Sequence, residues 1–222
     1  MNMNKNRVMS RKYVVISLLV MILGGVLFGA AIMKCFKMAG ITSLSNLSIC
    51  IILYVIVCIF CWMPLIVPAN QIAEMDENTV YITPQYSTMK KLKIAWYTLI
   101  NDTMKPFYRS IPIASIDKLT FTFQSQWGAY AYKRFSFELR LQVGEEKILV
   151  YINPGQNGPI IPSGYGVPFA GTLTKGEIAN LIGFFRSAGV QVADPYKLEA
   201  AMKDENVVLY DYLDSLNKKI RF

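Results

Sequence analysis

The sequence has no histidine and few cysteines. The cysteines all lie within the first 61 residues, at Cys35, Cys50, Cys58 and Cys61. Metal centres and acid–base or nucleophilic sites most often combine His, Cys and carboxylate side chains. The acidic pairs at 76–77 and 145–146 are typical of solvated turns rather than of a carboxylate site. We therefore expect no enzymatic activity, no cofactor and no metal site.

Cys58 and Cys61 have the spacing of a redox or metal-binding pair, but they stand inside a hydrophobic run. Without a histidine to complete a site, we interpret them as small packing residues. The absence of cysteine from residue 62 onward suits a reducing compartment.

Acidic residues are absent from the first 70 positions, whereas 17 of the 23 Lys and Arg follow that point together with all 15 Asp and Glu. Most of the net charge of +8 therefore belongs to the N-terminal region. A nucleic-acid-binding domain would carry a basic face of its own. The charge distribution thus argues against a nucleic-acid partner.

Charge is also missing from two long apolar runs, 13–33 and 47–67, each of 21 residues. At the rise of an α-helix, each run covers about 31 Å, the thickness of a bilayer core. Both are longer than the core of a signal peptide, about 7–15 residues. The sequence therefore predicts a transmembrane helical hairpin over 13–69, preceded by a basic leader, 1–12.

The flanking charges predict the orientation of this hairpin. Four cations precede the first run: Lys5, Arg7, Arg11 and Lys12. The connection between the runs carries only Lys34 and Lys37. By the positive-inside rule the N-terminus is cytoplasmic, and two crossings return the chain to the cytoplasm from about residue 70. We expect an integral plasma-membrane protein.

Gly25 and Gly29 form a Gly-xxx-Gly pair in the first run. Such spacing lets two helix backbones approach closely in lipid. The pair is compatible with packing against the second helix, with homo-oligomer formation, or with the ordinary frequency of glycine in membrane helices.

The remainder predicts an α+β fold, with an antiparallel sheet over 70–192 and a C-terminal helical tail over 193–222. Alternating apolar residues mark the strands, which we place within 72–83, 107–123, 130–143 and 147–152. Gly144 marks a tight hairpin turn between the last two strands. Thr174 and Glu177 have the spacing of a capping box, which predicts a helix that ends at Gly189. A second helical stretch follows Asp194, with an interruption at 204–206.

Residues 86–100 predict a basic amphipathic helix carrying Lys90, Lys91 and Lys93. Two uses fit the pattern: covering the sheet, which we favour, or lying on an acidic lipid surface together with the leader cations. A strand over 92–99 also remains open.

The segment 153–172 contains five glycines and four prolines, which predicts a long loop. Together with the solvated sheet face it offers a contact surface for a partner. Tyr130, Tyr132 and Tyr165 are the residues we expect there.

The order of hairpin, strands and capped helix includes the step Ile111-Pro112-Ile113-Ala114-Ser115-Ile116. This order resembles bacterial membrane proteins with a pleckstrin-homology-like cytoplasmic domain, in which an Ile-Pro-x-x-x-Ile step joins two strands. The resemblance implies a bent sheet closed by a helix that binds proteins or lipids without catalysis.

These observations predict a membrane-anchored cytoplasmic interaction module, an accessory or regulatory subunit of a cell-envelope complex. Its expected partners are the bilayer and a membrane or cytoplasmic protein. One alternative is a lipid-surface-sensing domain. Another is an oligomeric transport or bacteriocin-immunity component that works through its spans.

Overall fold

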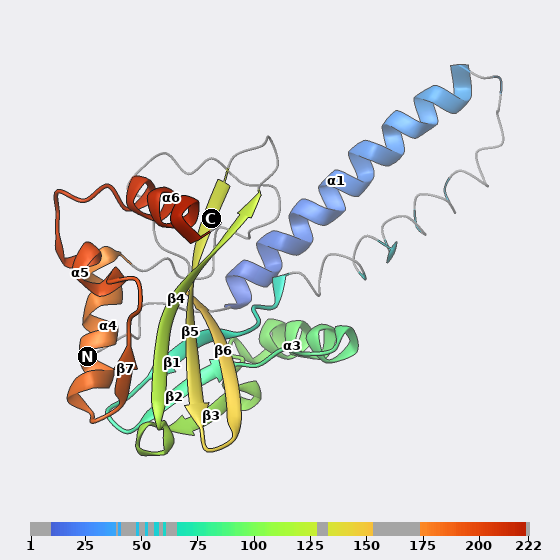
Figure 1. Cartoon of the computed structure of the whole chain (residues 1–222). Coiled ribbons are helices and arrows are strands. Elements are labelled where there is room, and N and C mark those ends of the chain that lie inside the picture. Colours follow the sequence, from blue (N-terminus) through green and yellow to red (C-terminus); the bar gives the residue numbers. More distant parts are fainter. Residues whose placement is uncertain are drawn as a thin grey trace. The chain divides into compact units, whose positions relative to one another are not determined.

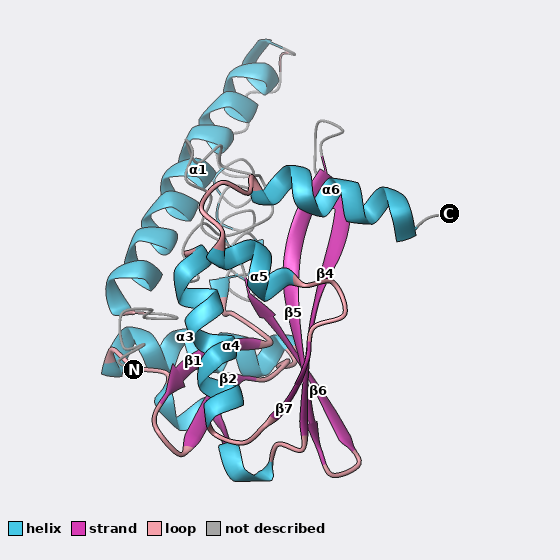
Figure 2. Ribbon diagram, turned by 60° about the vertical axis from the view of Figure 1, so that its left-hand side comes forward, coloured by secondary structure: helices cyan, strands magenta, loops and turns pink. Residues whose placement is uncertain are grey.

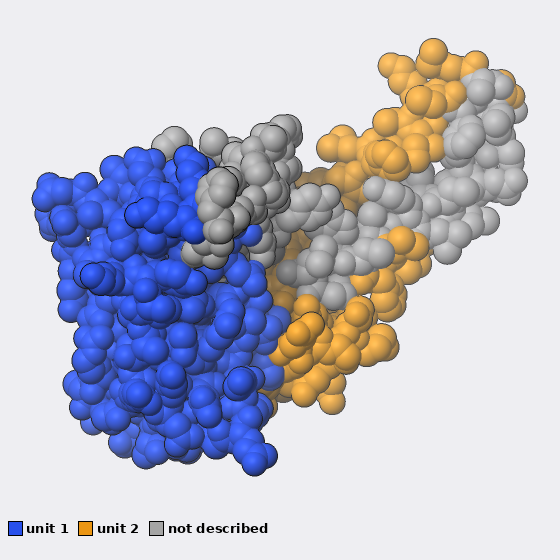
Figure 3. All heavy atoms as spheres, viewed as in Figure 1, with its two compact units in different colours: residues 1–8, 69–84, 108–222 blue, residues 9–68, 85–107 orange. Residues whose placement is uncertain are grey.

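The computed structural model describes residues 10–38, 40, 48, 52, 56, 57, 60, 66–127, 133–152 and 174–220. The chain divides into two compact units, coloured separately in Figure 3. The sheet unit comprises the described residues of 69–84 and 108–222. The helical unit comprises those of 9–68 and 85–107.

The predicted α+β class is confirmed: helices accompany one seven-stranded sheet (Figure 1). The helices are α1 (Arg11–Met38), α3 (Thr88–Asn101), α4 (Lys175–Ser187), α5 (Leu198–Lys203) and α6 (Leu209–Ile220). The strands are β1 (Gln71–Met75), β2 (Thr79–Thr83), β3 (Arg109–Pro112), β4 (Lys118–Trp127), β5 (Lys133–Val143), β6 (Glu146–Ile152) and β7 (Gln191–Ala193). Short 3₁₀ turns occupy Lys105–Phe107 and Ile113–Ser115.

The strands follow the order β3-β2-β1-β6-β5-β4-β7. The prediction of an antiparallel sheet is correct for most pairings, but β1 pairs with β6, and β4 with β7, in parallel. The long ladder between β4 and β5 runs from Lys118 opposite Gln142 to Trp127 opposite Lys133. The predicted β5–β6 hairpin is confirmed, and Gly144 turns it with a positive φ of 58°.

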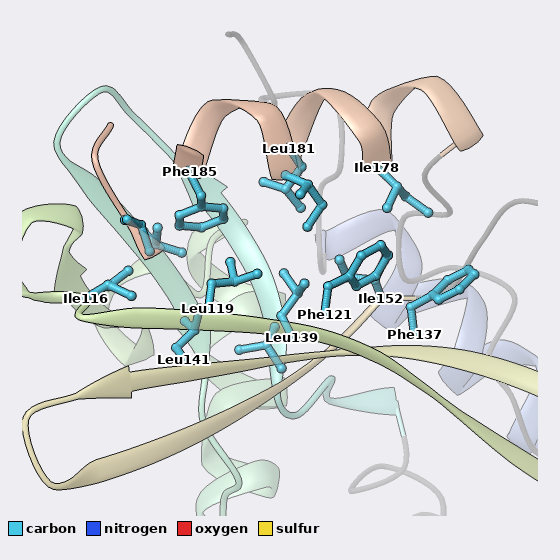
Figure 4. Packing of buried hydrophobic residues seen from close by; sticks show 14 of the residues in the cluster. Ile116, Leu119, Phe121, Phe137, Leu139, Leu141, Ile152, Ile178, Leu181 and Phe185 are labelled. Atoms are coloured by element: carbon cyan, nitrogen blue, oxygen red, sulfur yellow. The ribbon is translucent and has the colours of Figure 1, made fainter. Parts of the chain in front are cut away.

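The core lies on one face of this sheet, where alternate side chains of β4, β5 and β6 meet α4 (Figure 4). Phe121, Phe137 and Leu139 are fully buried beneath Leu181 and Phe185 of α4. Burying each side chain of this size contributes about 1.5–3 kcal/mol. The predicted capping box starts α4, with Thr174 and Glu177 each bonding the other's backbone N–H. Alternation in the strands and the stripe on the helix thus produce the same core.

The C-terminal helices belong to the sheet unit. The predicted interruption at 204–206 is confirmed, since it separates α5 from α6. Lys175 Nζ donates to the carbonyl oxygens of Asp204 (2.7 Å) and Val207 (2.9 Å), which fixes this interruption to the start of α4. Figure 2 shows α6 beside one end of β4 and β5, where the ring of Tyr210 contacts that of Phe135.

Within the described residues, α1 is the single helix that is long and apolar enough to cross a membrane. It extends the predicted span 13–33 at both ends. Of the predicted second span, 47–67, the structure describes only Ser48, Ile52, Ile56, Val57, Phe60, Ile66 and Val67. The second crossing of the hairpin therefore lies mostly outside the described residues.

Candidate functional site

The surface of α1 is the first feature that bears on function. Large apolar side chains along its length are exposed, including Val20 (64%), Leu23 (61%) and Leu27 (71%). Soluble monomers rarely present a continuous apolar surface of this kind to water. In a bilayer the same surface lies in hydrocarbon, and the helix satisfies its backbone hydrogen bonds internally. The exposure therefore favours a membrane helix over a core helix.

A single stripe of α1 is buried, and it contains both predicted helix-packing residues. The stripe comprises Val14, Met21, Gly25 and Gly29. Their spacings of seven and four place them on one helix face. Gly24, next to Gly25, is exposed, and a Cβ added there would meet nothing within 4 Å. Small residues are thus placed on the buried stripe of α1, although glycine also occurs outside it.

The helix α3 confirms the helical prediction for 86–100 over the strand alternative. Ser87 caps its N-terminus by accepting from the backbone N–H of Lys90. One face is buried and contains Leu92, Ile94, Ala95 and Thr98. The hydroxyl of Thr98 donates to the carbonyl of Ile94 at 2.9 Å, so this polar group is satisfied within the helix. This buried face is sufficient to pack the helix, so the remaining apolar residues of α3 are not needed for its packing.

Those remaining residues form a second, exposed apolar strip on α3, which we call the outer strip. It consists of Met89 (72% exposed), Trp96 (54%) and Ile100 (68%). Steps of seven and four along the helix place the three on one face. Lys93 and Lys90 are also exposed, and helical spacing places both along one side of the strip. The outer strip was not predicted as a face of its own, although a helical projection separates it from the buried arc.

The start of α1 is bonded to the end of α3. The backbone N–H of Arg11 donates to Asp102 Oδ1 at 2.6 Å, and the Arg11 guanidinium donates to the carbonyl of Ile100. Asp102 ends α3 in the left-handed region, with φ 55°. The two helices also pack against each other within the helical unit, as both ribbon views show (Figures 1 and 2). The C-terminal end of α3 is therefore held at the first residue of the candidate membrane helix.

Phe107, which follows α3, contacts both the residue Tyr86 before the helix and Tyr97 within it. The hydroxyl of buried Tyr86 donates to the carbonyl of Phe107. The ring of Phe107 meets that of Tyr97 edge-on, with 5.2 Å between centroids. Burial raises the pKa of Tyr86 to about 12, so the hydroxyl stays protonated and remains a donor at neutral pH. Lys90 Nζ lies 5.3 Å from the centroid of the Tyr86 ring, which suits a cation–π contact.

The sheet unit holds a second polar feature, on the face opposite α4. Glu138 of β5 is fully buried, and its Oε2 accepts from Arg140 Nη2 at 3.0 Å. Among the described residues, its Oε1 has no hydrogen-bond partner, and neither has Oγ1 of Thr122, the residue paired with Glu138 across the β4–β5 ladder. Two adjacent buried oxygens without a donor are unusual in a folded domain.

A charge cluster joins α4 to α5. Glu199 is buried and accepts two bonds from the Arg186 guanidinium, at 3.0 and 2.6 Å, and one from Lys203 Nζ at 2.8 Å. The hydrogen bond from Arg186 lowers the pKa of Glu199, and the hydrogen bond from Lys203 lowers it by a smaller amount. Backbone N–H groups of Leu198 and Glu199 donate to Asp194. Since every carboxylate oxygen of Glu199 is paired, we interpret this cluster as structural.

Several predicted site residues lie within the described part of the chain. Arg11, Lys12, Lys90 and Lys93 are exposed, and Lys91 is half-buried. Arg11 lies where α1 meets the C-terminal end of α3, whereas Lys90 and Lys93 lie in the first half of α3. Five predicted residues lie outside the described residues: Lys5, Arg7, Tyr130, Tyr132 and Tyr165. No cluster of His, Cys, Asp and Glu that could hold a metal occurs among the residues that the structure describes.

Comparison of the chain with protein-family models, with curated proteins and with solved structures gave no match. The functional argument therefore rests on the chain's own surfaces. The fold and these surfaces define an α+β protein with one helix suited to a membrane and a second helix joined to it.

Proposed function

We propose that the protein is a membrane-anchored interaction module, an accessory or regulatory subunit of a cell-envelope assembly. The observation that carries the proposal is the exposed, uncharged apolar surface of α1 in a chain that also folds a separate sheet unit. The helix supplies the location, and the sheet unit supplies the surface for a partner. In this proposal the N-terminus and the sheet unit both lie in the cytoplasm.

The sheet unit is suited to a binding role. Two of its polar features, the Glu199 cluster and the capping box, stabilise its helices. The Glu199 cluster holds α4 to α5, and the capping box holds the start of α4. A sheet with one face covered by a helix is also the arrangement expected of a pleckstrin-homology-like domain, which we retain as part of the proposal. Such domains bind proteins or lipids, and we assign no reaction to this one.

The described residues of the sheet unit expose few large apolar side chains, and these stand two positions apart in the sequence. They are Val208 (63%) and Tyr210 (43%), at the start of α6. Aromatic and aliphatic residues exposed at a helix end are suited to anchor a protein contact. We therefore place the partner surface at this end of α6.

Cross-linking in native membranes tests the proposal. A photoreactive residue at Val208 should capture a reproducible partner, identified by mass spectrometry, whereas the same residue at exposed Lys147 in the sheet unit should not. Extraction with alkaline carbonate should leave the protein in the membrane. Release by carbonate would refute the anchor, and equal capture from both positions would refute a specific partner at α6.

A further inference from the structure

The outer strip of α3 is apolar although the helix needs no further apolar face for its own packing. Ile94, Ala95 and Thr98 are completely buried on the opposite arc. Both ends of the helix are fixed, by the Ser87 cap at the start and by the Arg11 bonds at the end. The exposure of Met89, Trp96 and Ile100 is therefore a property of an ordered helix and not of a frayed one.

The position of the strip along the membrane normal follows from its connection to α1. Arg11 is the first residue of α1, and the uncharged stretch of that helix begins two residues later, at Tyr13. If α1 crosses the bilayer, Arg11 lies at the level of the lipid headgroups. The bond from the Arg11 amide to Asp102, one residue beyond α3, then holds the end of α3 at this same level. Ile100 and Trp96 are in the last two turns of the helix.

The charge of α3 points to the occupant of this face. The sequence of the helix, TMKKLKIAWYTLIN, has three lysines and no acidic residue. Basic residues beside a membrane are attracted to acidic headgroups. Trp is favoured at the boundary between headgroups and acyl chains. An apolar strip bordered by lysines, next to a membrane helix, is the pattern of a helix that lies in the interface.

We propose that α3 is an interfacial helix, which inserts the outer strip of Met89, Trp96 and Ile100 among the lipids around α1 and directs Lys90 and Lys93 to acidic headgroups. This inference rests on the proposed membrane anchor. It assigns α3 a role of its own: through the Arg11 bonds, the helix fixes the depth and direction in which α1 enters the bilayer. The leaflet it recognises is one that contains anionic phospholipid.

Tryptophan fluorescence of the full-length protein in vesicles tests this assignment. The chain has three tryptophans, so Trp62→Phe with Trp127→Phe leaves Trp96 as the reporter. In vesicles that contain phosphatidylglycerol, Trp96 should emit at shorter wavelength, resist quenching by acrylamide, and be quenched by lipids brominated near the headgroup. In vesicles of phosphatidylcholine alone these effects should be weaker. High salt should reduce the difference between the two, since it screens the lysines.

Matched variants separate the two parts of the surface. In the reporter protein, Met89→Ser with Ile100→Ser should increase acrylamide quenching of Trp96 in both kinds of vesicle. Lys90→Gln with Lys93→Gln should remove the preference for phosphatidylglycerol. Lys147→Gln removes an exposed lysine of the sheet unit and should leave Trp96 unchanged. Far-UV circular dichroism checks that each variant keeps its helices.

Two outcomes would overturn the proposal. The first is a Trp96 that is equally accessible to acrylamide in both kinds of vesicle and in detergent. The second is a Trp96 that is shielded in native membranes only, which would make the occupant a protein. Carbonate extraction of the same samples distinguishes these failures from failure of the anchor. A protein retained in the membrane with an accessible Trp96 contradicts the role of α3 alone, whereas a protein released by carbonate contradicts the proposed function.

Discussion

Glu138 shows most directly how a single residue can depart from the pattern around it. Alternation along β5 places Phe137 and Leu139 in the core and Glu138 on the other face, where a charged residue is expected to be solvated. The structure buries it completely; one oxygen is bonded to exposed Arg140, and the other has no donor within the part of the chain that the structure describes. Burying a carboxylate costs several kcal/mol unless it is paired. The pairing with Arg140 is therefore important for the sheet.

Removing the guanidinium should destabilise the sheet unit. We expect Arg140→Met to lower the free energy of unfolding by about 1.5–3 kcal/mol, the range for hydrogen bonds to charged groups. Glu138→Gln removes the charge that Arg140 compensates, so the double variant should recover most of this loss. Pulse proteolysis in urea measures the unfolding of the sheet unit in detergent. Equal losses for Arg140→Met in both backgrounds would contradict the pairing.

Glu199 predicts a dependence of stability on pH. Its pKa in the folded protein is lowered from the ordinary value of 4.5, chiefly by Arg186. The folded state therefore binds fewer protons than the unfolded state in this range. The stabilisation is fully present above pH 4.5 and is lost as the pH falls through the lowered pKa.

We expect Glu199→Gln to be less stable than the wild type at neutral pH and to lose less stability on acidification. The comparison must be with wild type, because bonded Asp76 and Glu146 also have a lowered pKa. Glu205→Gln changes an exposed carboxylate and is the control. Its stability should depend on pH as that of the wild type does. Urea midpoints measured from pH 7 downward give the slope. Parallel slopes for Glu199→Gln and wild type would show that the cluster does not contribute.

At the scale of elements, sequence patterns that lie within a single segment predicted the helices, strands and turns correctly. The capping box at Thr174, the alternation of β4 and β5, and the turn at Gly144 all appear as expected. The strand β7 was not predicted, because three residues are too few for a periodic signal and its parallel pairing with β4 depends on tertiary contacts. The parallel contact of β1 with β6 is likewise set by the fold.

The buried stripe of α1 gives a prediction about a helix face. Gly25→Leu and Gly29→Leu each place a large side chain on that stripe, so we expect them to weaken helix packing and lower the thermal stability in detergent. Gly24→Leu is the matched control: the position is exposed and open, and the change should have little effect. Thermal unfolding followed by solvent exposure of thiols measures the difference. Equal shifts for all three variants would show that the stripe has no special role in packing.

At the scale of the whole molecule, contacts between distant residues decide which segments fold together. The sequence analysis set 193–222 apart as a tail. In the structure the ring of Tyr196 contacts that of Phe123, and Ser125 donates to Asn217, so these helices share the sheet's unit. Similarly, 85–107 groups with α1 through the bonds of Arg11. Neither grouping follows from periodicity, because each depends on side chains about 70–90 positions apart.

The predicted topology can be tested on the whole chain. With two crossings, the connection between the apolar runs lies outside and the sheet unit lies in the cytoplasm with the N-terminus; with one crossing by α1, the sheet unit lies outside. In a variant with all four cysteines changed to Ser, single cysteines at Ser43 and Ser187 report the two locations. Ser187 is exposed at the end of α4 and accessible to a reagent.

In intact cells a membrane-impermeant maleimide should label Ser43→Cys and not Ser187→Cys. After permeabilisation it should label both, which controls for accessibility. The positive-inside rule places the four leader cations in the cytoplasm, and two crossings return the sheet unit to that side. Labelling of Ser187→Cys in intact cells would mean that the chain crosses once. That result would place the partner of α6 outside the cytoplasm. It would also contradict the role of the Arg11 bonds, because α3 follows α1 in the chain and meets Arg11 on the same side of the membrane only if the chain crosses back.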